Sequence, residues 1–222
     1  MVAELLSGLR AHVVGKLAIN LQNRVASQLD RLIRQLLIDA ASLWRQDGFS
    51  RWSDGELACT VRIYDCALSV IENDPEAWAL IHVQYDGTQP TLKMRRGLAD
   101  PAKATRPDLN VRIGSAVIHV EAKRLHLRDG LPKKYLNLGM RRFIDGQYST
   151  AGHGLGAMIS FVLSDDPQDA IDAVNEMIIA TPDLGPSHII DLPDAVADRV
   201  LLHTSFHNGG LRLFHHAVDI RP

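Results

Sequence analysis

The sequence predicts an α/β chain, in which helices alternate with strands and pack on a sheet. Three observations support this class. Apolar residues recur at three- and four-residue steps over residues 3–46, the spacing of an amphipathic helix. Residues that alternate between apolar and polar flank a short turn at 114–115, as expected for adjoining strands. Towards the C-terminus, two strand-like runs surround the turn residues 207–210, which is a hairpin signal.

The length of 222 residues fits one domain, or one domain with a helical extension. We expect residues 1–50 to form an N-terminal helical arm packed on the core, and residues 51–222 to form the main domain. No run of about 18 uncharged apolar residues exists, so no membrane span is expected. The first four residues lack the basic and apolar regions of a secretory signal. We therefore expect a cytoplasmic protein.

The first helical run ends at Asp47-Gly48. Its apolar positions include Leu21, Val25, Leu29, Ile33, Leu36 and Leu37. Two roles remain open for this helix: an arm that packs against the core, which we favour, or a contact between two copies of the chain. We expect Trp44 and Trp52 to anchor the corner after the helix as core residues, not as platforms for stacked bases.

A second helix is expected over 53–72, followed by a break at 73–75 and an apolar strand over 77–83. Cys59 and Cys66 lie seven residues apart on this helix. That separation is about 10 Å of helical rise, too far for a disulfide. We expect both to be free core thiols in a reducing compartment.

Three side chains around the 114–115 turn give the strongest chemical signal: Asp108, Glu121 and Lys123. Residues two apart on a strand point to one face, so Glu121 and Lys123 should lie together. The opposite face is apolar and contains Ile118, Val120 and Ala122. A hairpin through the turn would bring Asp108 or its neighbours alongside Glu121.

Two close carboxylates form an oxygen-ligand site for Mg²⁺ or Mn²⁺, to which the carbonyl of Ala122 could add a further ligand. Such an ion polarises a phosphate and lowers the pKa of a bound water. A neighbouring lysine can orient or deprotonate that water and offset the charge on phosphorus. The alternative is an ordinary strand, on which Glu121 and Lys123 form a solvated ion pair worth little energy.

Pro107-Asp108 and Glu121-Ala122-Lys123 together resemble the short signature of the PD-(D/E)xK nuclease superfamily. The resemblance implies a restriction-endonuclease-like core, that is, a mixed central β-sheet flanked by helices, here with an N-terminal helical extension. It also implies Mg²⁺-dependent hydrolysis of DNA by Asp108, Glu121 and Lys123.

Members of this superfamily often have an additional acid on a helix ahead of the sheet, and Glu56 is the candidate for that metal ligand. Ser53 and Glu56 fit a helix-capping box, S-x-x-E, equally well. A helix after the E-x-K motif often directs a polar or basic side chain at the metal centre. Residues 133–148 have helical spacing, and the resemblance makes Arg142 and Gln147 candidates for contact with the scissile phosphate, with Arg141 as a competitor.

Positive charge is concentrated around the motif. Residues 93–142 contain thirteen Lys and Arg against four Asp and Glu, a balance of +9, whereas the whole chain has a net charge of −2. Such a distribution favours a phosphate-backbone partner. The basic stretch 93–106 is expected to be a loop at the mouth of the site, where Arg95, Arg96 or Lys103 would contact substrate. The alternative is that basic loops merely offset acidic helices elsewhere in the fold.

The glycine-rich stretch 152–156 precedes a strand-like run, 157–163, and therefore does not predict a phosphate-binding loop. A helix over 166–180 and two strands, 200–206 and 211–218, should complete the chain. Four histidines lie near this end: His203, His207, His215 and His216. Strand alternation places neighbours on opposite faces, so we expect edge-strand or substrate-contact roles and no common zinc site.

The sequence thus predicts a metal-dependent DNA endonuclease, with RNA not excluded. A nuclease of this kind would suit restriction or anti-phage defence, with target choice supplied by homodimerisation or by a partner protein subunit. Two alternatives stay open. One is a catalytically inactive nucleic-acid-binding or assembly subunit on the same fold. The other is an enzyme of different phosphate chemistry, such as RNA or nucleotide hydrolysis.

Overall fold

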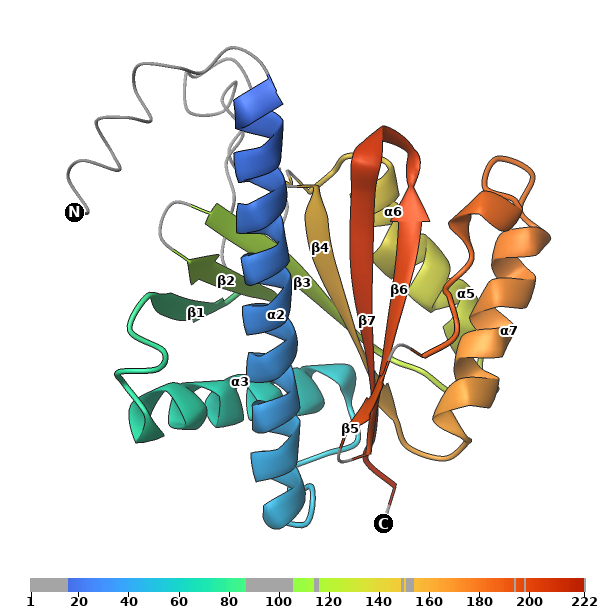
Figure 1. The fold of residues 1–222 in the computed structure, drawn as a ribbon. Helices are drawn as coiled ribbons and strands as arrows, with labels where there is room; N and C mark the ends of the chain where they lie inside the picture. The colour runs from blue at the N-terminus through green and yellow to red at the C-terminus, as the bar shows by residue number, and fades with distance from the viewer. Residues whose placement is uncertain are drawn as a thin grey trace, which may run out of the picture.

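A seven-stranded mixed sheet forms the centre of the structure, with helices on both faces (Figure 1). The computed structural model describes residues 16–86, 106–113, 116–148, 150, 154–193, 195–197 and 199–221. In chain order the elements are α2 (Lys16–Gln46), α3 (Glu56–Asn73), β1 (Ile81–Tyr85), β2 (Leu109–Ile113), β3 (Ala116–Arg124), α5 (Leu131–Tyr135), η2 (Leu136–Met140), α6 (Arg141–Ile144), β4 (Leu155–Val162), α7 (Pro167–Ile179), η3 (Pro186–His188), β5 (Ala195–Ala197), β6 (Val200–His207), η4 (Asn208–Gly210) and β7 (Leu211–Asp219).

The strand order is β1-β2-β3-β4-β7-β6-β5. β4 pairs in parallel with both β3 and β7, and the other neighbours are antiparallel. The parallel pairs need crossover connections, which the helical run from α5 to α6 and helix α7 supply. The predicted α/β class is confirmed, and the strand pairing makes the sheet a mixed one.

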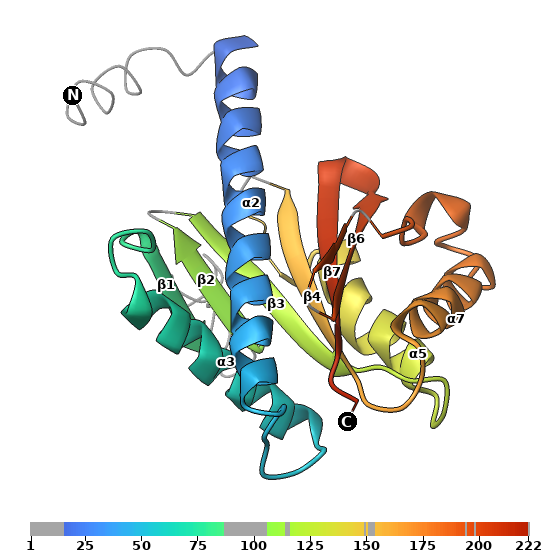
Figure 2. The same ribbon diagram turned by 60° about the horizontal axis from the view of Figure 1, so that its bottom comes forward.

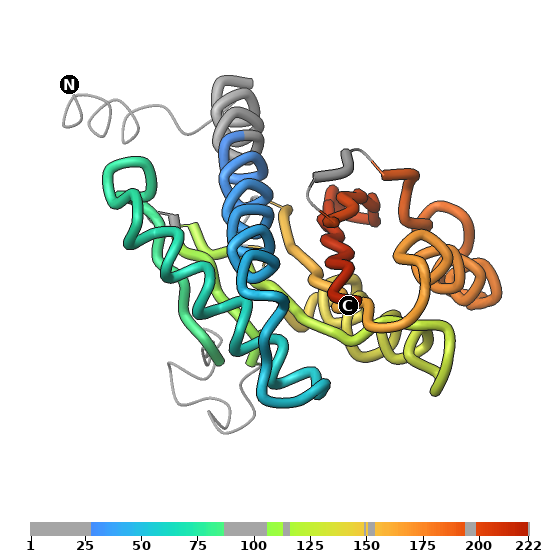
Figure 3. Tube along the Cα trace, turned by 90° about the horizontal axis from the view of Figure 1, so that it is seen from below, coloured from blue at the N-terminus to red at the C-terminus, as the bar shows by residue number. Residues whose placement is uncertain are grey.

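Each face of the sheet has its own apolar core. One face packs against α2 and α3, and the other packs against α5, η2, α6 and α7 (Figure 3). β4 is buried along its whole length because it lies between both layers. Its successive side chains enter opposite cores: Ala157 and Ile159 join the first, and Met158 joins the second.

Helix α2 packs on the sheet along its second half. Its buried residues there belong to the same core as the central strands: Leu29, Ile33, Leu36, Leu37, Ala40, Ala41 and Trp44. The predicted positions Leu21 and Val25 have side chains outside the described set. The N-terminal turns of α2 extend beyond the strands (Figure 2). Within the described residues, none of the helices is long and apolar enough to cross a membrane.

Several predicted elements are confirmed with small shifts of boundary, and two expectations are wrong. The first strand begins at Ile81, not at 77, because the carboxylate of Asp74 accepts the backbone N–H of Ala77 and stabilises a turn there. Trp44 is fully buried as expected, and its indole N–H donates to the carbonyl of Ser50. Trp52 is 74% exposed and anchors no corner, because the chain between α2 and α3 turns its side chain outwards.

Both cysteines are free and buried in the first core, as predicted. The expected basic loop lies outside the described residues except for its last member, Arg106. Arg95, Arg96 and Lys103 are therefore without a structural description. The helix expected at 133–148 is a continuous helical run from Leu131 to Ile144 that includes one π-helical segment, η2.

Candidate active site

The β2–β3 pairing brings the two predicted carboxylates together. Leu109 lies opposite Val120 in the antiparallel register, which places Asp108 beside Glu121. The backbone N–H of Ala122 donates to Oδ2 of Asp108 at 2.7 Å and holds this carboxylate against β3. The hairpin relation expected from the sequence is therefore confirmed.

Side chains alternate along β3 as predicted. The apolar set on one face is packed under α2 and α3, and it consists of Ile118, Val120 and Ala122. Glu121 and Lys123 point to the opposite face. There Lys123 lies against Gly139 of η2, and Glu121 contacts Arg142 of α6.

The ammonium group of Lys123 lies where acidic side chains from three elements converge. It contacts four oxygen atoms: Oε1 of Glu121 at 2.7 Å, the carbonyl of Ala122 at 2.7 Å, Oε1 of Glu56 at 3.0 Å and Oδ2 of Asp108 at 3.8 Å. We call Glu56, Asp108, Glu121 and Lys123 the Lys123 cluster. Three carboxylates surrounding one cation form an arrangement that an ordinary solvated ion pair does not have.

Glu56 belongs to this cluster and not to a capping box. It is the first residue of α3, whose N-cap is Gly55 and has no side-chain cap. The hydroxyl of Ser53 accepts the N–H of Gly55 instead. Oε2 of Glu56 accepts the backbone N–H of Arg124 at 3.2 Å, so its carboxylate spans from α3 to β3. Of the two roles open for this residue, the capping box is wrong.

Glu121 is fully buried, and both of its carboxylate oxygens are occupied by donors. Besides Lys123, Nη1 of Arg142 donates to Oε1 at 2.9 Å and to Oε2 at 3.0 Å. The hydroxyl of Tyr148 donates to Oε2 at 2.5 Å and accepts from Arg142 at 2.8 Å. The sequence analysis gave Tyr148 no role and placed it at the end of the helix expected over 133–148, whereas the helix ends at Ile144 and Tyr148 lies in the turn that follows.

The π-helical segment η2 decides which arginine faces the cluster. A π turn contains one residue more than an α turn, so it rotates the residues that follow around the helix axis. Arg142 reaches Glu121, whereas Arg141 points to the turn after α7 and binds Asp183 at 2.7 and 2.9 Å. Gln147 is exposed on the turn after α6. Of the three predicted phosphate-binding residues, Arg142 is the one placed against Glu121.

The helix that contains Arg142 is held to β4 at Gly156. A Cβ atom there would lie 2.5 Å from two ring carbons of Phe143 and 2.8 Å from Cδ2 of Leu213. We expect Gly156→Ala to lower the free energy of unfolding by about 1–3 kcal/mol, because the ring and α6 must move. Urea denaturation measures this change. The double variant Gly156→Ala with Phe143→Leu should recover part of the loss, and full stability of Gly156→Ala would contradict the packing argument.

Burial and like charge alter the acid–base properties of the cluster. Burial, followed by the charge of Glu121, raises the pKa of Asp108 to about 6, against the lowering effect of Lys123. Burial by itself lowers the pKa of Lys123, but the carboxylates of Glu121 and Asp108 outweigh it and raise that pKa. Lys123 is therefore a charged ammonium at neutral pH.

The donor set of the cluster suits a hard divalent cation. Its potential ligands are carboxylate oxygens and the Ala122 carbonyl, the ligand type that Mg²⁺ and Mn²⁺ prefer. These oxygens already converge on a single positive charge. In the part of the chain that the structure describes, no three His, Cys, Asp or Glu side chains form a ready metal cluster, and the ammonium of Lys123 lies between the carboxylates instead.

The C-terminal histidines are arranged differently from our expectation. His203 lies directly opposite His215 in the β6–β7 register, so these two share a face, whereas His216 is on the other face. Buried side chains form a hydrogen-bonded chain on the shared face. In order, it links His188, His207, Ser205, His215 and Tyr135 at distances of 2.6, 2.8, 2.7 and 2.8 Å.

The expected edge-strand or substrate-contact roles are wrong for all four histidines, because each of them is buried. The cross-strand register brings together residues of different strands, which alternation within a single strand does not relate. We name the five linked residues the histidine chain.

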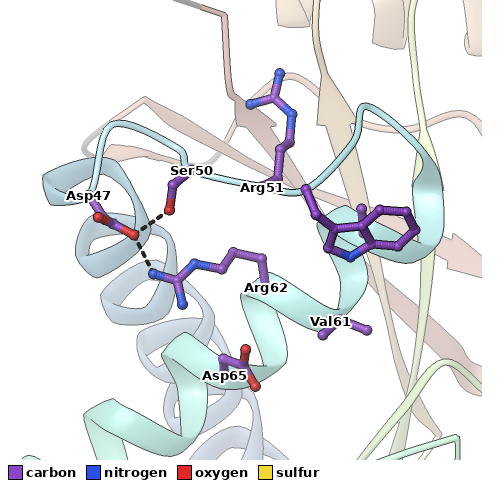
Figure 4. A pocket seen from close by; sticks show the side chains of 8 residues that line it. Asp47, Ser50, Arg51, Val61, Arg62 and Asp65 are labelled. Atoms are coloured by element: carbon purple, nitrogen blue, oxygen red, sulfur yellow. Dashed lines mark hydrogen bonds and ion pairs between the residues drawn. The ribbon is translucent and has the colours of Figure 1, made fainter.

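A pocket lies where the loop after α2 meets α3 (Figure 4). Asp47 accepts hydrogen bonds from Ser50 and Arg62 at its wall, and Arg51, Val61 and Asp65 also line it. None of its lining residues belongs to the Lys123 cluster. We therefore assign the candidate active site to the cluster and not to this pocket.

Comparison of the chain with protein-family models, with curated proteins and with solved structures found no match.

Proposed function

We propose that this chain is a metal-dependent nuclease that hydrolyses phosphodiester bonds of DNA at the Lys123 cluster. The observation that supports this most directly is the convergence of Glu56, Asp108 and Glu121 on the ammonium of Lys123. These residues come from α3, from the position just before β2 and from β3, so the fold gathers acids that are far apart in the sequence. A resemblance to the PD-(D/E)xK superfamily assigns the same residues to this chemistry.

Asp108, Glu121 and the Ala122 carbonyl would hold Mg²⁺ or Mn²⁺, and Glu56 would complete the ligand set. When bound, the ion would polarise the phosphate and lower the pKa of a water molecule. Lys123 is charged at neutral pH because its pKa is raised. This favours stabilisation of negative charge and orientation of the water over removal of a proton by the lysine.

Charge supports a nucleic-acid substrate, and DNA in particular is what the resemblance to the PD-(D/E)xK superfamily implies. The basic segment 93–142 surrounds the cluster in sequence, and Lys133 and Lys134 of α5 are exposed for contact with a phosphate backbone. Assays on plasmid DNA, single-stranded DNA and RNA compare the substrate classes. Preferential cleavage of RNA, or hydrolysis of nucleotides alone, would replace DNA in this proposal.

We further propose a cytoplasmic setting, with restriction or anti-phage defence as the biological role. Target choice would come from homodimerisation or from a partner protein subunit. The proposed role and the proposed dimer rest on the type of chemistry and not on a contact in the structure. Sedimentation of the purified chain with and without a DNA duplex tests the dimer, which should appear as a doubled mass.

One observation favours the alternative of an inactive nucleic-acid-binding or assembly subunit. Both carboxylate oxygens of Glu121 are contacted by protein donors, which is an arrangement that also suits a purely structural cluster. A measurement of metal binding distinguishes the nuclease from the inactive subunit.

Calorimetric titration with Mn²⁺ is expected to show binding to the wild-type chain and at least tenfold weaker binding to Asp108→Ala. The reason is that the substitution removes one of the two central carboxylates. Asp172→Ala, which changes an exposed acid on α7, serves as the control and should bind Mn²⁺ like the wild type. Equal weak binding by the wild type and Asp108→Ala would favour the inactive subunit.

A further inference from the structure

Protein donors enclose both oxygens of the Glu121 carboxylate. Lys123 and Arg142 contact Oε1, and Tyr148 and the same nitrogen of Arg142, Nη1, contact Oε2. A cation that binds Glu121 therefore competes with these donors.

Arg142 is the donor that can leave most easily. Its side chain is 35% exposed, whereas that of Lys123 is 9% exposed and bonds to several oxygens at once. Tyr148 is 2% exposed, and its ring packs edge-on against Phe143 with centroids 5.0 Å apart. The side chain of Arg142 is therefore partly open to solvent, whereas the other two donors are buried.

Charge balance also favours release of Arg142. Three carboxylates, those of Glu56, Asp108 and Glu121, face two cations, Lys123 and Arg142, so this group has a formal charge of −1. A divalent ion that enters the group supplies the charge that Glu121 otherwise receives from Arg142.

We propose that Arg142 couples cation binding to phosphate binding. Without a cation it neutralises Glu121. When a cation takes Glu121, the guanidinium is released and becomes a bidentate donor for a phosphate of the nucleic-acid backbone. The two ligands then bind cooperatively, and by linkage each tightens the binding of the other by the same factor. This inference rests on the proposed function, because it takes the Lys123 cluster as a cation site.

The first test is calorimetric titration with Mn²⁺ in the absence of nucleic acid. Arg142→Gln should bind Mn²⁺ about tenfold more tightly than the wild type, because the cation no longer has to displace the guanidinium. Arg141→Gln removes an equal charge from the neighbouring residue, which pairs with Asp183, and should leave the affinity unchanged. Arg142→Lys keeps the charge but loses the contact with two oxygens, and it should also bind more tightly than the wild type.

The second test measures the affinity for a cleavage-resistant phosphorothioate duplex with and without Mn²⁺. In the wild type and Arg141→Gln, Mn²⁺ should tighten duplex binding at least tenfold. In Arg142→Gln the gain should fall below about threefold, because the released phosphate donor is missing. Thermal unfolding of each variant checks that the fold is retained, and Arg142→Lys serves for both tests if Arg142→Gln does not fold.

Two results would overturn the coupling and leave the proposed nuclease standing. In the first, Arg142→Gln and Arg142→Lys bind Mn²⁺ no more tightly than the wild type. In the second, Mn²⁺ tightens duplex binding by these variants as much as it does in the wild type. A wild-type chain that binds no Mn²⁺ would instead reject the cation site itself, and the coupling with it. The outcome for the wild type therefore separates failure of the inference from failure of the proposed function.

Discussion

Replacement of Lys123 by alanine is expected to abolish Mg²⁺-dependent cleavage of DNA while the protein stays folded. Among the described residues, Lys123 is the only one in contact with all three acids of its cluster, and its raised pKa keeps it charged at neutral pH. Loss of one electrostatic contact to a transition state costs roughly 10²–10³-fold in rate. Plasmid nicking, measured with highly purified protein, gives the rate.

Arg45→Ala is the matched control, because it removes an exposed cation of α2 that lies outside the basic segment 93–142. It should cleave at a rate within a few-fold of the wild type. Binding of Mn²⁺ to Lys123→Ala should persist or strengthen, since the ammonium that lies between the carboxylates is gone. Undiminished cleavage by Lys123→Ala would reject the active site, whatever the metal affinity.

Acidification below pH 6.5 is expected to destabilise the folded chain through the histidine chain. Burial, followed by the charge of His188, lowers the pKa of His207 from 6.5 to about 4. Burial likewise lowers the pKa of His215 far below its usual range. The unfolded chain therefore takes up protons at a higher pH than the folded chain does. Neutral His207 contributes its full share of the folding stability above pH 6.5, and this share is lost as the pH falls towards 4.

The loss from His207 alone is roughly 3 kcal/mol over this range, from about 1.4 kcal/mol per pKa unit. Urea denaturation at pH 7.5, 6 and 5 measures it. Asp108, whose raised pKa works in the opposite direction, reduces the net change between pH 6 and 4. His207→Gln keeps an amide that can bond to Ser205 but cannot titrate, so its stability should depend less on pH. Equal unfolding midpoints of the wild type at pH 7.5 and 5 would contradict the prediction.

Regular spacing of side chains along the strands made the arrangement around Asp108, Glu121 and Lys123 predictable. The alternation of side chains on β3 depends on neighbouring residues alone, so the shared face of Glu121 and Lys123 followed directly from the sequence. Only two residues separate the end of β2 from the start of β3, and so short a connection leaves little freedom in register. The position of Asp108 beside Glu121 followed for that reason. Helix α7 and the β6–β7 hairpin were predicted on the same local grounds.

Contacts between elements that are far apart in the sequence could be identified only from the tertiary structure. Glu56 lies 67 residues from Lys123, and its sequence context fitted a helix cap as well as a ligand. Arg141 and Arg142 are adjacent, and the π-helical turn before them determines which one faces β3. Tyr148 occupies an irregular turn that has no periodicity.

The sequence by itself therefore determined the strand pair with its acids and its lysine, because local backbone geometry fixes which side chains share a face. Only the tertiary structure decided how those charges are neutralised, and that a row of histidines is buried on the same sheet. Both depend on how helices and strands separated in the sequence pack together, and the free energy of that packing is not encoded in the spacing of any single segment.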